Sequence, residues 1–348
     1  MESRAAPGRG QACAAPGCAA ASAQRCGGAA MRIGRRAILG TVLAAPALAA
    51  TDYPTRPVRL VVGYPAGGST DLVARLLAER LFKAWGQPVT VENRGGAAGT
   101  LGADLVAKAA PDGYTLLVGA SAEMAIARAV MRAIPYQPED FAPVALLTEQ
   151  PFLVLVNAAQ PVGSLAELVA LARQRPGMLN YASHGTGTAN HLLSELLRVE
   201  TGIAITHIPY RGGGPAMTDL MSGQVQMLLD VIPSALPHLL SGRIRALALC
   251  RTTRSATLAG VPTTAEAGFP FLAGSTWSTL VAPARTPEPV LARIGETVQA
   301  AVREVLTDAF RERGLEPLGG DAAAARAFIA AEQTKWQRIA SRTGVQPE

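Results

Sequence analysis

Four times along this chain, a short apolar segment runs through a glycine-containing turn directly into a segment with helical periodicity. The turns span residues 63–69, 94–100, 183–190 and 209–215. The segment before the first turn, 57–64, is rich in β-branched residues, and segment 69–85 repeats apolar residues every three to four positions. Strands that alternate with helices at this spacing predict a parallel α/β sheet.

The same alternation continues to the C-terminus. We expect further strands at 89–92, 114–118, 152–156, 179–182, 204–208, 225–230, 245–249 and 276–282. We expect further helices at 101–109, 165–173, 188–200, 215–221, 289–306 and 322–342. A chain of 348 residues is long enough for two domains, and two α/β lobes of similar size accommodate this series.

Glycine turns before helices favour anion binding. The first amides of a helix have no intrahelical acceptor and carry a partial positive charge, and glycine lets a ligand oxygen approach the backbone. Ser69 and Thr188 are good N-cap types, so their hydroxyls could cap a helix or bind a ligand. Two such turns that face each other would hold a carboxylate. The alternative is four ordinary tight turns with glycine at strained positions.

Other anion and catalytic sites are not supported by the motifs. No Gly-Lys-Ser/Thr follows any turn, and a dinucleotide pattern starting at Gly185 fails at Asn190. A serine nucleophile elbow around Ser121 fails because Glu123 stands where glycine is needed. The four histidines lack metal-ligand spacing, and Cys250 ends an apolar strand, as a packing residue does. We therefore expect no catalytic residue, no metal and no cofactor.

Two acidic residues follow glycine turns. Asp71 and Asp219 are expected in first helical turns, where the helix dipole favours a negative charge. For Asp71, ordering of the preceding loop is a second interpretation. Arg211 is expected to be solvated, and Trp277 fits either a core or a pocket wall.

The first 49 residues account for most of the positive charge. They hold six arginines and one acidic residue, which leaves 26 basic and 25 acidic residues in the remainder and excludes nucleic acid as the partner. Residues 31–49 have the basic region, short apolar run and Ala47-Leu48-Ala49 site of a signal peptide. Residues 1–30 fit no part of it and are interpreted as a gene-model extension. We expect a soluble protein exported to the periplasm.

A series of motifs runs in order through the mature chain. They are Tyr64-Pro65-Ala66-Gly67-Gly68-Ser69-Thr70-Asp71, Val91-Glu92-Asn93-Arg94, Ala110-Pro111-Asp112-Gly113-Tyr114-Thr115-Leu116, Asp140-Phe141-Ala142-Pro143-Val144, Gly185-Thr186-Gly187-Thr188 with His191-Leu192, Pro209-Tyr210-Arg211-Gly212-Gly213, Pro233-Ser234-Ala235-Leu236-Pro237-His238, Val261-Pro262-Thr263 and Ala282-Pro283. Together they resemble the Bug family, the periplasmic solute receptors of tripartite tricarboxylate transporters.

The resemblance implies a flytrap of two Rossmann-like lobes joined by two crossover segments. Lobe 1 would comprise residues 50–152 and 274–348, and lobe 2 residues 153–273. A ligand carboxylate would lie between the first glycine turn and the Gly/Thr turn of lobe 2. Carried onto this chain, the implied binding residues are Tyr64, Pro65, Ala66, Gly67, Gly68, Ser69, Asp71, Ser121, Ser183, Gly187, Thr188, His191, Tyr210 and Asp230.

The chain departs from the family pattern at two places near the expected cleft. After Ser121 the family often has an Asn-Pro pair, whereas this chain reads Met124-Ala125-Ile126-Ala127-Arg128, and Val231 lies where Asn commonly follows Asp230. The implied function is a monomeric receptor that captures a small carboxylate and delivers it to a membrane permease. The alternatives are a secreted α/β hydrolase or transferase, and a sensing module for a membrane kinase.

Overall fold

The computed structural model describes residues 52–345, which form strands and helices around one mixed sheet. The predicted extension, signal peptide and cleavage site lie outside the described residues. Up to residue 157 the elements are β1 (Val58–Val62), α1 (Ser69–Trp85), β2 (Val89–Asn93), η1 (Ala97–Gly99), α2 (Thr100–Ala107), β3 (Thr115–Ala120), η2 (Ala122–Ile126), α3 (Ala127–Val130), η3 (Pro138–Asp140) and β4 (Phe141–Asn157).

The chain then continues through a second series and returns to the first. The second series is α4 (Leu165–Gln174), β5 (Leu179–Ser183), α5 (Ala189–Thr201), β6 (Ile205–Pro209), α6 (Gly213–Ser222), β7 (Met227–Val231), α7 (Ile232–Leu240) and β8 (Ile244–Leu249). The C-terminal elements are η4 (Pro270–Leu272), β9 (Ser275–Pro283), α8 (Glu288–Ala301), η5 (Val302–Leu306), α9 (Thr307–Arg311), β10 (Glu316–Pro317) and α10 (Ala322–Thr343).

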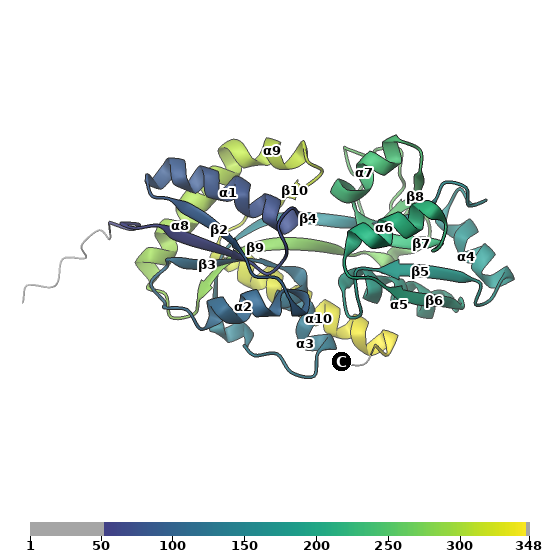
Figure 1. Ribbon diagram of the computed structural model, residues 1–348, viewed down its shortest axis with the longest axis horizontal. Helices are drawn as coiled ribbons and strands as arrows, with labels where there is room; N and C mark the ends of the chain where they lie inside the picture. The colour runs from purple at the N-terminus through teal and green to yellow at the C-terminus, as the bar shows by residue number, and fades with distance from the viewer. Residues whose placement is uncertain (1–51, 346–348) are drawn as a thin grey trace, which may run out of the picture. The chain divides into compact units, whose positions relative to one another are not determined.

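The strand order is β2-β1-β3-β9-β4-β7-β5-β6, with β8 and β10 also pairing with β4 (Figure 1). Strand β1 lies parallel to β2 and β3, and β5 lies parallel to β6 and β7, as the sequence predicted. Strand β4 pairs antiparallel with β9 through Pro151 and with β7 from Phe152 onward. One long strand thus joins the two parallel groups.

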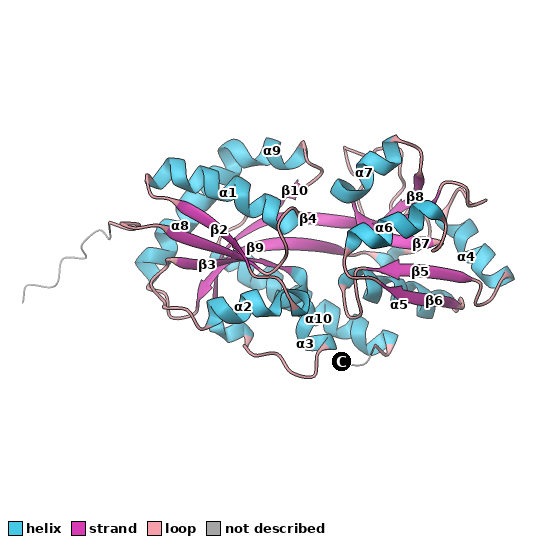
Figure 2. Ribbon diagram, in the orientation of Figure 1, coloured by secondary structure: helices cyan, strands magenta, loops and turns pink. Residues whose placement is uncertain are grey.

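Helices cover both faces of the sheet (Figure 2). Alternation along β1 explains this: Val58, Leu60 and Val62 pack in the core beneath α1 and α8, whereas Val61 packs in the core that contains α2 residues. A strand buried on both faces reads as a nearly continuous apolar run, and β1 (VRLVV) fits this except at the partly buried Arg59. The α/β fold predicted from the sequence is confirmed. The sheet is mixed and not wholly parallel, because β4 pairs antiparallel with β7, β8 and β9.

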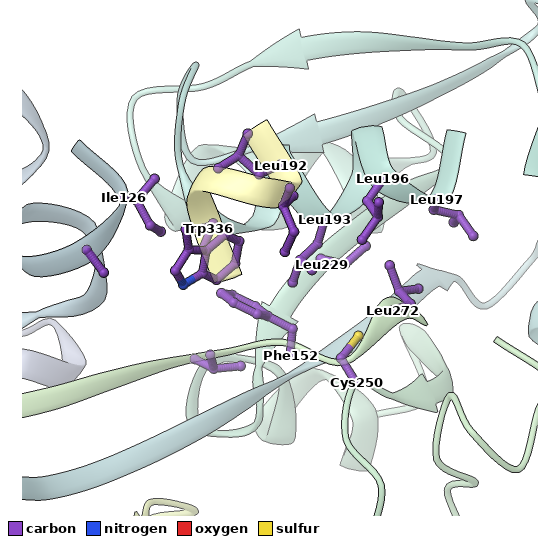
Figure 3. Packing of buried hydrophobic residues seen from close by; sticks show 14 of the residues in the cluster. Ile126, Phe152, Leu192, Leu193, Leu196, Leu197, Leu229, Cys250, Leu272 and Trp336 are labelled. Atoms are coloured by element: carbon purple, nitrogen blue, oxygen red, sulfur yellow. The ribbon is translucent and has the colours of Figure 1, made fainter. Parts of the chain in front are cut away.

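Helix α10 returns the C-terminal part of the chain to the centre of the largest core. Figure 3 shows its Trp336 beside Phe152 of β4 and Leu193 of α5, with Ile126 of η2 nearby. The indole Nε1 of Trp336 and that of Trp277 on β9 both donate to Glu332 Oε2, at 2.9 and 3.0 Å. Trp277 is therefore a core residue.

Besides the short elements α3, α9 and β10, which were not predicted, three larger features differ from the sequence prediction. Strand β4 is far longer than segment 152–156 because it continues through Pro143, near a register shift, and Pro151. Helix α7 was not predicted because Pro233 and Pro237 read as breakers, yet Pro233 lies in its first turn, where no amide donor is needed. The π-helical turn η2 has no periodicity signature of its own. None of the helices in residues 52–345 has the combined length and apolar character that a membrane crossing requires.

Candidate functional site

The first and second glycine turns lie against each other at the ends of β1 and β2. Asn93 Nδ2 donates to the Tyr64 carbonyl at 3.0 Å, and Arg94 N–H donates to the Val62 carbonyl at 2.7 Å. A Cβ on Gly95 would lie 3.3 Å from Pro65 Cδ. Residues 65–68 are exposed, so this pair of turns presents backbone to solvent.

Asp71, in the first turn of α1, orders the glycine turn that precedes the helix. The buried carboxylate accepts from Gly67 N–H at 2.9 Å, from Arg75 Nε at 2.8 Å and from Asn93 Nδ2 at 2.9 Å. Burial by itself would raise the pKa of Asp71, but the hydrogen bonds, led by that from Arg75, outweigh it and lower the pKa. Asp71 is thus occupied by protein donors, which supports the loop-ordering interpretation.

Glu123 is a buried carboxyl group that the motifs pointed to only as an obstacle to a serine elbow. Its Oε1 accepts from Ala120 N–H and its Oε2 from the Tyr64 hydroxyl, each at 2.6 Å. The Tyr64 hydroxyl also lies 3.3 Å from the Ala98 carbonyl, so Tyr64 and Glu123 connect the first turn, the second turn and η2. Burial raises the pKa of Glu123 to about 7. Tyr64 lies 59 residues away in sequence, so spacing could not have revealed this contact.

The third and fourth glycine turns form a second pair, at the ends of β5 and β6. Tyr210 N–H donates to the Ser183 carbonyl at 3.0 Å, and Gly212 N–H donates to the His184 carbonyl at 3.2 Å. The buried Ser183 hydroxyl lies 2.6 Å from His207 Nε2. The Tyr210 hydroxyl donates to Asp219 at 2.6 Å, in the second turn of α6, so Asp219 does not cap that helix.

His191 fixes the Gly/Thr turn from within α5. Its Nδ1 accepts from Gly187 N–H at 3.0 Å, and its ring stacks on that of His207 with centroids 4.0 Å apart. Burial, and then the neighbouring His207, lower the pKa of His191 to about 4, so the imidazole is neutral at pH 7. A neutral ring is what an accepting Nδ1 requires.

Asp230 of β7 lies next to His184 of the third turn. Asp230 Oδ1 accepts from Val231 N–H at 2.7 Å, while Oδ2 lies 3.4 Å from His184 Nε2. Both Oδ2 and Nε2 are buried and make no hydrogen bond within the described residues. A Cβ on Gly213 would lie 3.1 Å from His184 Nε2, which is why glycine fits there.

In the helices that follow the four glycine turns, as in α7 and α8, the N-cap residue makes no side-chain capping bond; in α5 the His191 N–H donates instead to Asn190 Oδ1 at 3.1 Å. Gly68, Gly99, Thr188 and Gly212 occupy the N-cap positions of α1, α2, α5 and α6 without a capping bond. By contrast, Ser164 caps α4 and Asp321 caps α10. Uncapped helix starts at the carboxyl ends of strands are suited to bind an anion.

Neither of the two residues interpreted as caps makes a side-chain capping bond. Ser69 is the first residue of α1, after the cap. The Thr188 hydroxyl lies 2.6 Å from both the Gly185 carbonyl and Asn190 Oδ1, so it stiffens its own turn.

Two of the four turns face one cavity of about 80 Å³. Ala98 comes from the second turn and Thr186 and Gly187 from the third; the rest of the wall is Ala122, Ile126, Ala127, Val130 and Met131. A Cβ on Gly187 would lie 3.0 Å from Val130 Cγ2, so the approach is close. Residues 64–71 do not line this cavity; Tyr64 contacts the second turn through its hydroxyl group, 3.3 Å from the Ala98 carbonyl.

The remaining predicted residues have structural contacts. Ser121 is buried, with its hydroxyl 2.9 Å from that of Thr276, and Cys250 is a buried core residue. Arg211 is exposed. Within residues 52–345, no group of three or more His, Cys, Asp or Glu residues is placed to hold a metal ion.

Comparison with known proteins identifies a family whose sequences match this chain. Residues 73–345 match the family described as tripartite tricarboxylate transporter family receptor. The chain is 38% identical to Protein BugT of Bordetella pertussis over 315 residues, which covers 88% of this chain and 97% of that protein.

Two solved structures with bound acids are similar to the chain. An R. palustris protein with adipate is 38% identical and superposes with a TM-score of 0.80, covering 85% of this chain and all of the other. MatC from Rhodopseudomonas palustris with bound malate is 34% identical, with a TM-score of 0.74, covering 83% of this chain and all of the other.

Proposed function

Since the chain belongs to the Bug (TctC) family of periplasmic solute-binding receptors of tripartite tricarboxylate transporters, we propose that it captures a small dicarboxylate and delivers it to a membrane permease. The family consists of solute receptors, so the hydrolase or transferase alternative is set aside. Adipate and malate, the acids bound in two similar solved structures, each have two carboxylate groups, and this is the reason for proposing a dicarboxylate here.

One observation carries the proposal: the turns that lead into α2 and α5 meet at one cavity, through Ala98 on one side and Thr186 and Gly187 on the other. Two helix N-termini supply partial positive charge and amide donors without a buried arginine. A cavity of about 80 Å³ holds roughly two to three water molecules at ~30 Å³ each. We therefore assign it to one carboxylate head group and place the rest of the ligand outside it.

The residues of the first turn support this site without lining it. Tyr64, Glu123 and Asp71 hold the first and second turns together, and His191 and Thr188 hold the third. We propose that residues 65–69, together with Tyr210 and Asp230, contact the remainder of the ligand when the two pairs of turns separate to admit it. The ligand shifts the equilibrium between the two spacings of the turns only if it binds one spacing more tightly than the other.

The pairing of the crossing strands supports the lobe boundaries expected from the sequence. We propose lobe 1 at residues 50–152 and 274–348 and lobe 2 at 153–273, because the pairing of β4 changes from β9 to β7 at Phe152 and β9 begins at Ser275. We also propose that residues 31–49 direct export to the periplasm and that the mature receptor is a monomer.

Calorimetric titration of the purified protein with adipate and malate tests this function. We expect saturable 1:1 binding to at least one diacid with a Kd in the micromolar range or tighter, about −8 kcal/mol or better. Hexanoate, which has the length of adipate with one carboxylate, is the matched control and should bind at least tenfold more weakly. Recovery of a chemically altered acid, or no binding of either diacid, would contradict the proposal.

A further inference from the structure

A second and larger hollow lies on the other side of the η2–α3 segment. It is an open groove of about 460 Å³ between this segment and helix α10. Its polar lining comes from Arg128 on α3 and from one face of α10, mainly Gln333, Gln337, Arg338 and Ser341. Nothing in the proposed carboxylate site uses these side chains.

The groove carries two positively charged side chains that have no acidic partner within it. Arg128 and Arg338 are exposed, no acidic residue lines the groove, and neither arginine makes a hydrogen bond or ion pair with any described residue. Neighbouring arginines on α5 and α10 are neutralised: Arg198 pairs with Glu195, and Arg342 pairs with Glu200. A guanidinium group binds carboxylates through two parallel hydrogen bonds, so two free ones in a groove match an acidic occupant.

Both walls of the groove are held in place. The opposite face of α10 is anchored in the core by Trp336 and Glu332, as Figure 3 shows for Trp336. Gln333 Nε2 donates to the Met124 carbonyl of η2 at 2.9 Å, which ties one wall to the other. When a partner binds a preformed groove, little binding free energy is lost in ordering the side chains of the groove.

The η2–α3 segment connects the groove to the carboxylate cavity. Ala125 and Arg128 line the groove, whereas Ala122, Ile126 and Val130 line the cavity. A π-helical turn is a common feature at functional sites. A partner seated in the groove would therefore touch the same short segment that the ligand touches.

We propose that this groove is the docking surface for an acidic segment, rich in Asp and Glu, of the membrane protein that receives the ligand. The identity of the partner as a membrane protein rests on the proposed function, but the acidic chemistry of the occupant rests on Arg128 and Arg338. Their exposure and lack of intramolecular partners leave them available to carboxylates of another chain.

The test uses a fluorescein-labelled ten-residue peptide of alternating Glu and Ser, followed by fluorescence anisotropy at low salt. The full-length protein binds it saturably, and the double variant Arg128→Glu/Arg338→Glu binds it at least tenfold more weakly. The matched control is Arg326→Glu, the same charge change at an exposed position of α10 outside the groove, and it should change the Kd less than twofold. Adipate titration of each variant checks that the fold and the carboxylate site are intact.

Three outcomes overturn the proposal: no saturable peptide binding, an equal loss in the Arg326→Glu variant, or displacement of the peptide by citrate at matched ionic strength, which would make the groove a small-anion site. Binding of the wild type to phosphatidylglycerol vesicles in place of the peptide would equally contradict it. Failure of adipate and malate to bind while the peptide still binds would refute the proposed function and leave the groove assignment standing.

Discussion

Glu123 and His191 are buried titratable groups, and each holds a glycine turn through a hydrogen bond. Glu123 connects to the first two turns through Tyr64, and His191 accepts from Gly187 in the third. Burial moves their pKa values in opposite directions toward the neutral form, to about 7 for Glu123 and about 4 for His191. The two residues therefore give stability an opposite dependence on pH.

The Glu123→Gln variant should flatten the pH dependence of stability between pH 4.5 and 7. In the wild type the unfolded chain ionises first as the pH rises, so the contribution of Glu123 is full below pH 4.5 and is lost by about pH 7. The shift corresponds to about 3 kcal/mol at ~1.36 kcal/mol per unit. Glutamine can accept from Ala120 N–H and donate to the Tyr64 hydroxyl oxygen, so the contacts survive. Urea unfolding at several pH values measures this, and an unchanged slope would refute the assignment.

His191 gives the reverse dependence. Its native pKa lies below the unfolded value of 6.5, so its contribution is full above pH 6.5 and falls as the pH drops toward about 4. The His191→Phe variant keeps a stacked ring but removes both the titration and the acceptor for Gly187 N–H. We expect a loss of about 1 kcal/mol at pH 7 and a smaller loss of stability on acidification than in the wild type. A variant that loses stability between pH 6.5 and 4 as steeply as the wild type would rule this out.

At the scale of elements, the glycine turns matter because they leave helix starts uncapped. Gly187 is the glycine at which a substitution best tests the role of the third turn in the cavity. Its φ is +76°, and a Cβ there would lie 3.0 Å from Val130 Cγ2, at the wall of the cavity. Gly202, at the other end of α5, has a similar φ of +66° with nothing within 4 Å of its Cβ position.

Gly202→Ala should lower stability by about 1 kcal/mol, because it places alanine in the left-handed region. Gly187→Ala should lower it by at least as much, because its Cβ also comes within 3.0 Å of Val130 Cγ2. Only Gly187→Ala should weaken diacid binding, by at least tenfold, since only its methyl group narrows the cavity. Thermal unfolding and calorimetry of both variants separate strain from steric loss. Equal losses of affinity in the two variants would show that the cavity does not hold the ligand.

The elements best predicted from sequence are those whose pattern is local. Helix α1 occupies Ser69–Trp85 as predicted, because its apolar face and its glycine at each end are all present in one segment. Helix α7 was missed because prolines argue against a helix when their position within it is unknown. The four turns were found, but which two share a cavity depends on contacts such as Gly187 with Val130, 57 positions apart in the chain, which no spacing rule gives.

At the scale of the whole molecule, helix α10 packs against the long strand β4, against η2 and α3, and against α5. Its Glu332 accepts from the indole groups of Trp277 on β9 and Trp336, and Lys335 Nζ lies 2.9 Å from the other carboxylate oxygen. The role of Glu332 could not be predicted from the sequence, because its indole donors come from β9 and α10, two elements that only the fold brings together.

Glu332→Ala should leave two buried indole N–H groups without an acceptor. At about 1–3 kcal/mol for each unsatisfied group, the free energy of unfolding should fall by roughly 2–6 kcal/mol. Arg326→Ala, at an exposed position of the same helix, should stay within about 0.5 kcal/mol of the wild type. The urea midpoint at constant m-value measures both, and a neutral Glu332→Ala would refute this role.

Amide chemical shifts during a titration with adipate or malate test the central claim most directly, since they locate the carboxylate on the backbone. The account predicts that the largest shifts fall on Ala98, Gly99, Thr186 and Gly187, with the same residues affected by either acid. Saturable binding whose shifts leave these four amides in place and fall elsewhere would contradict it.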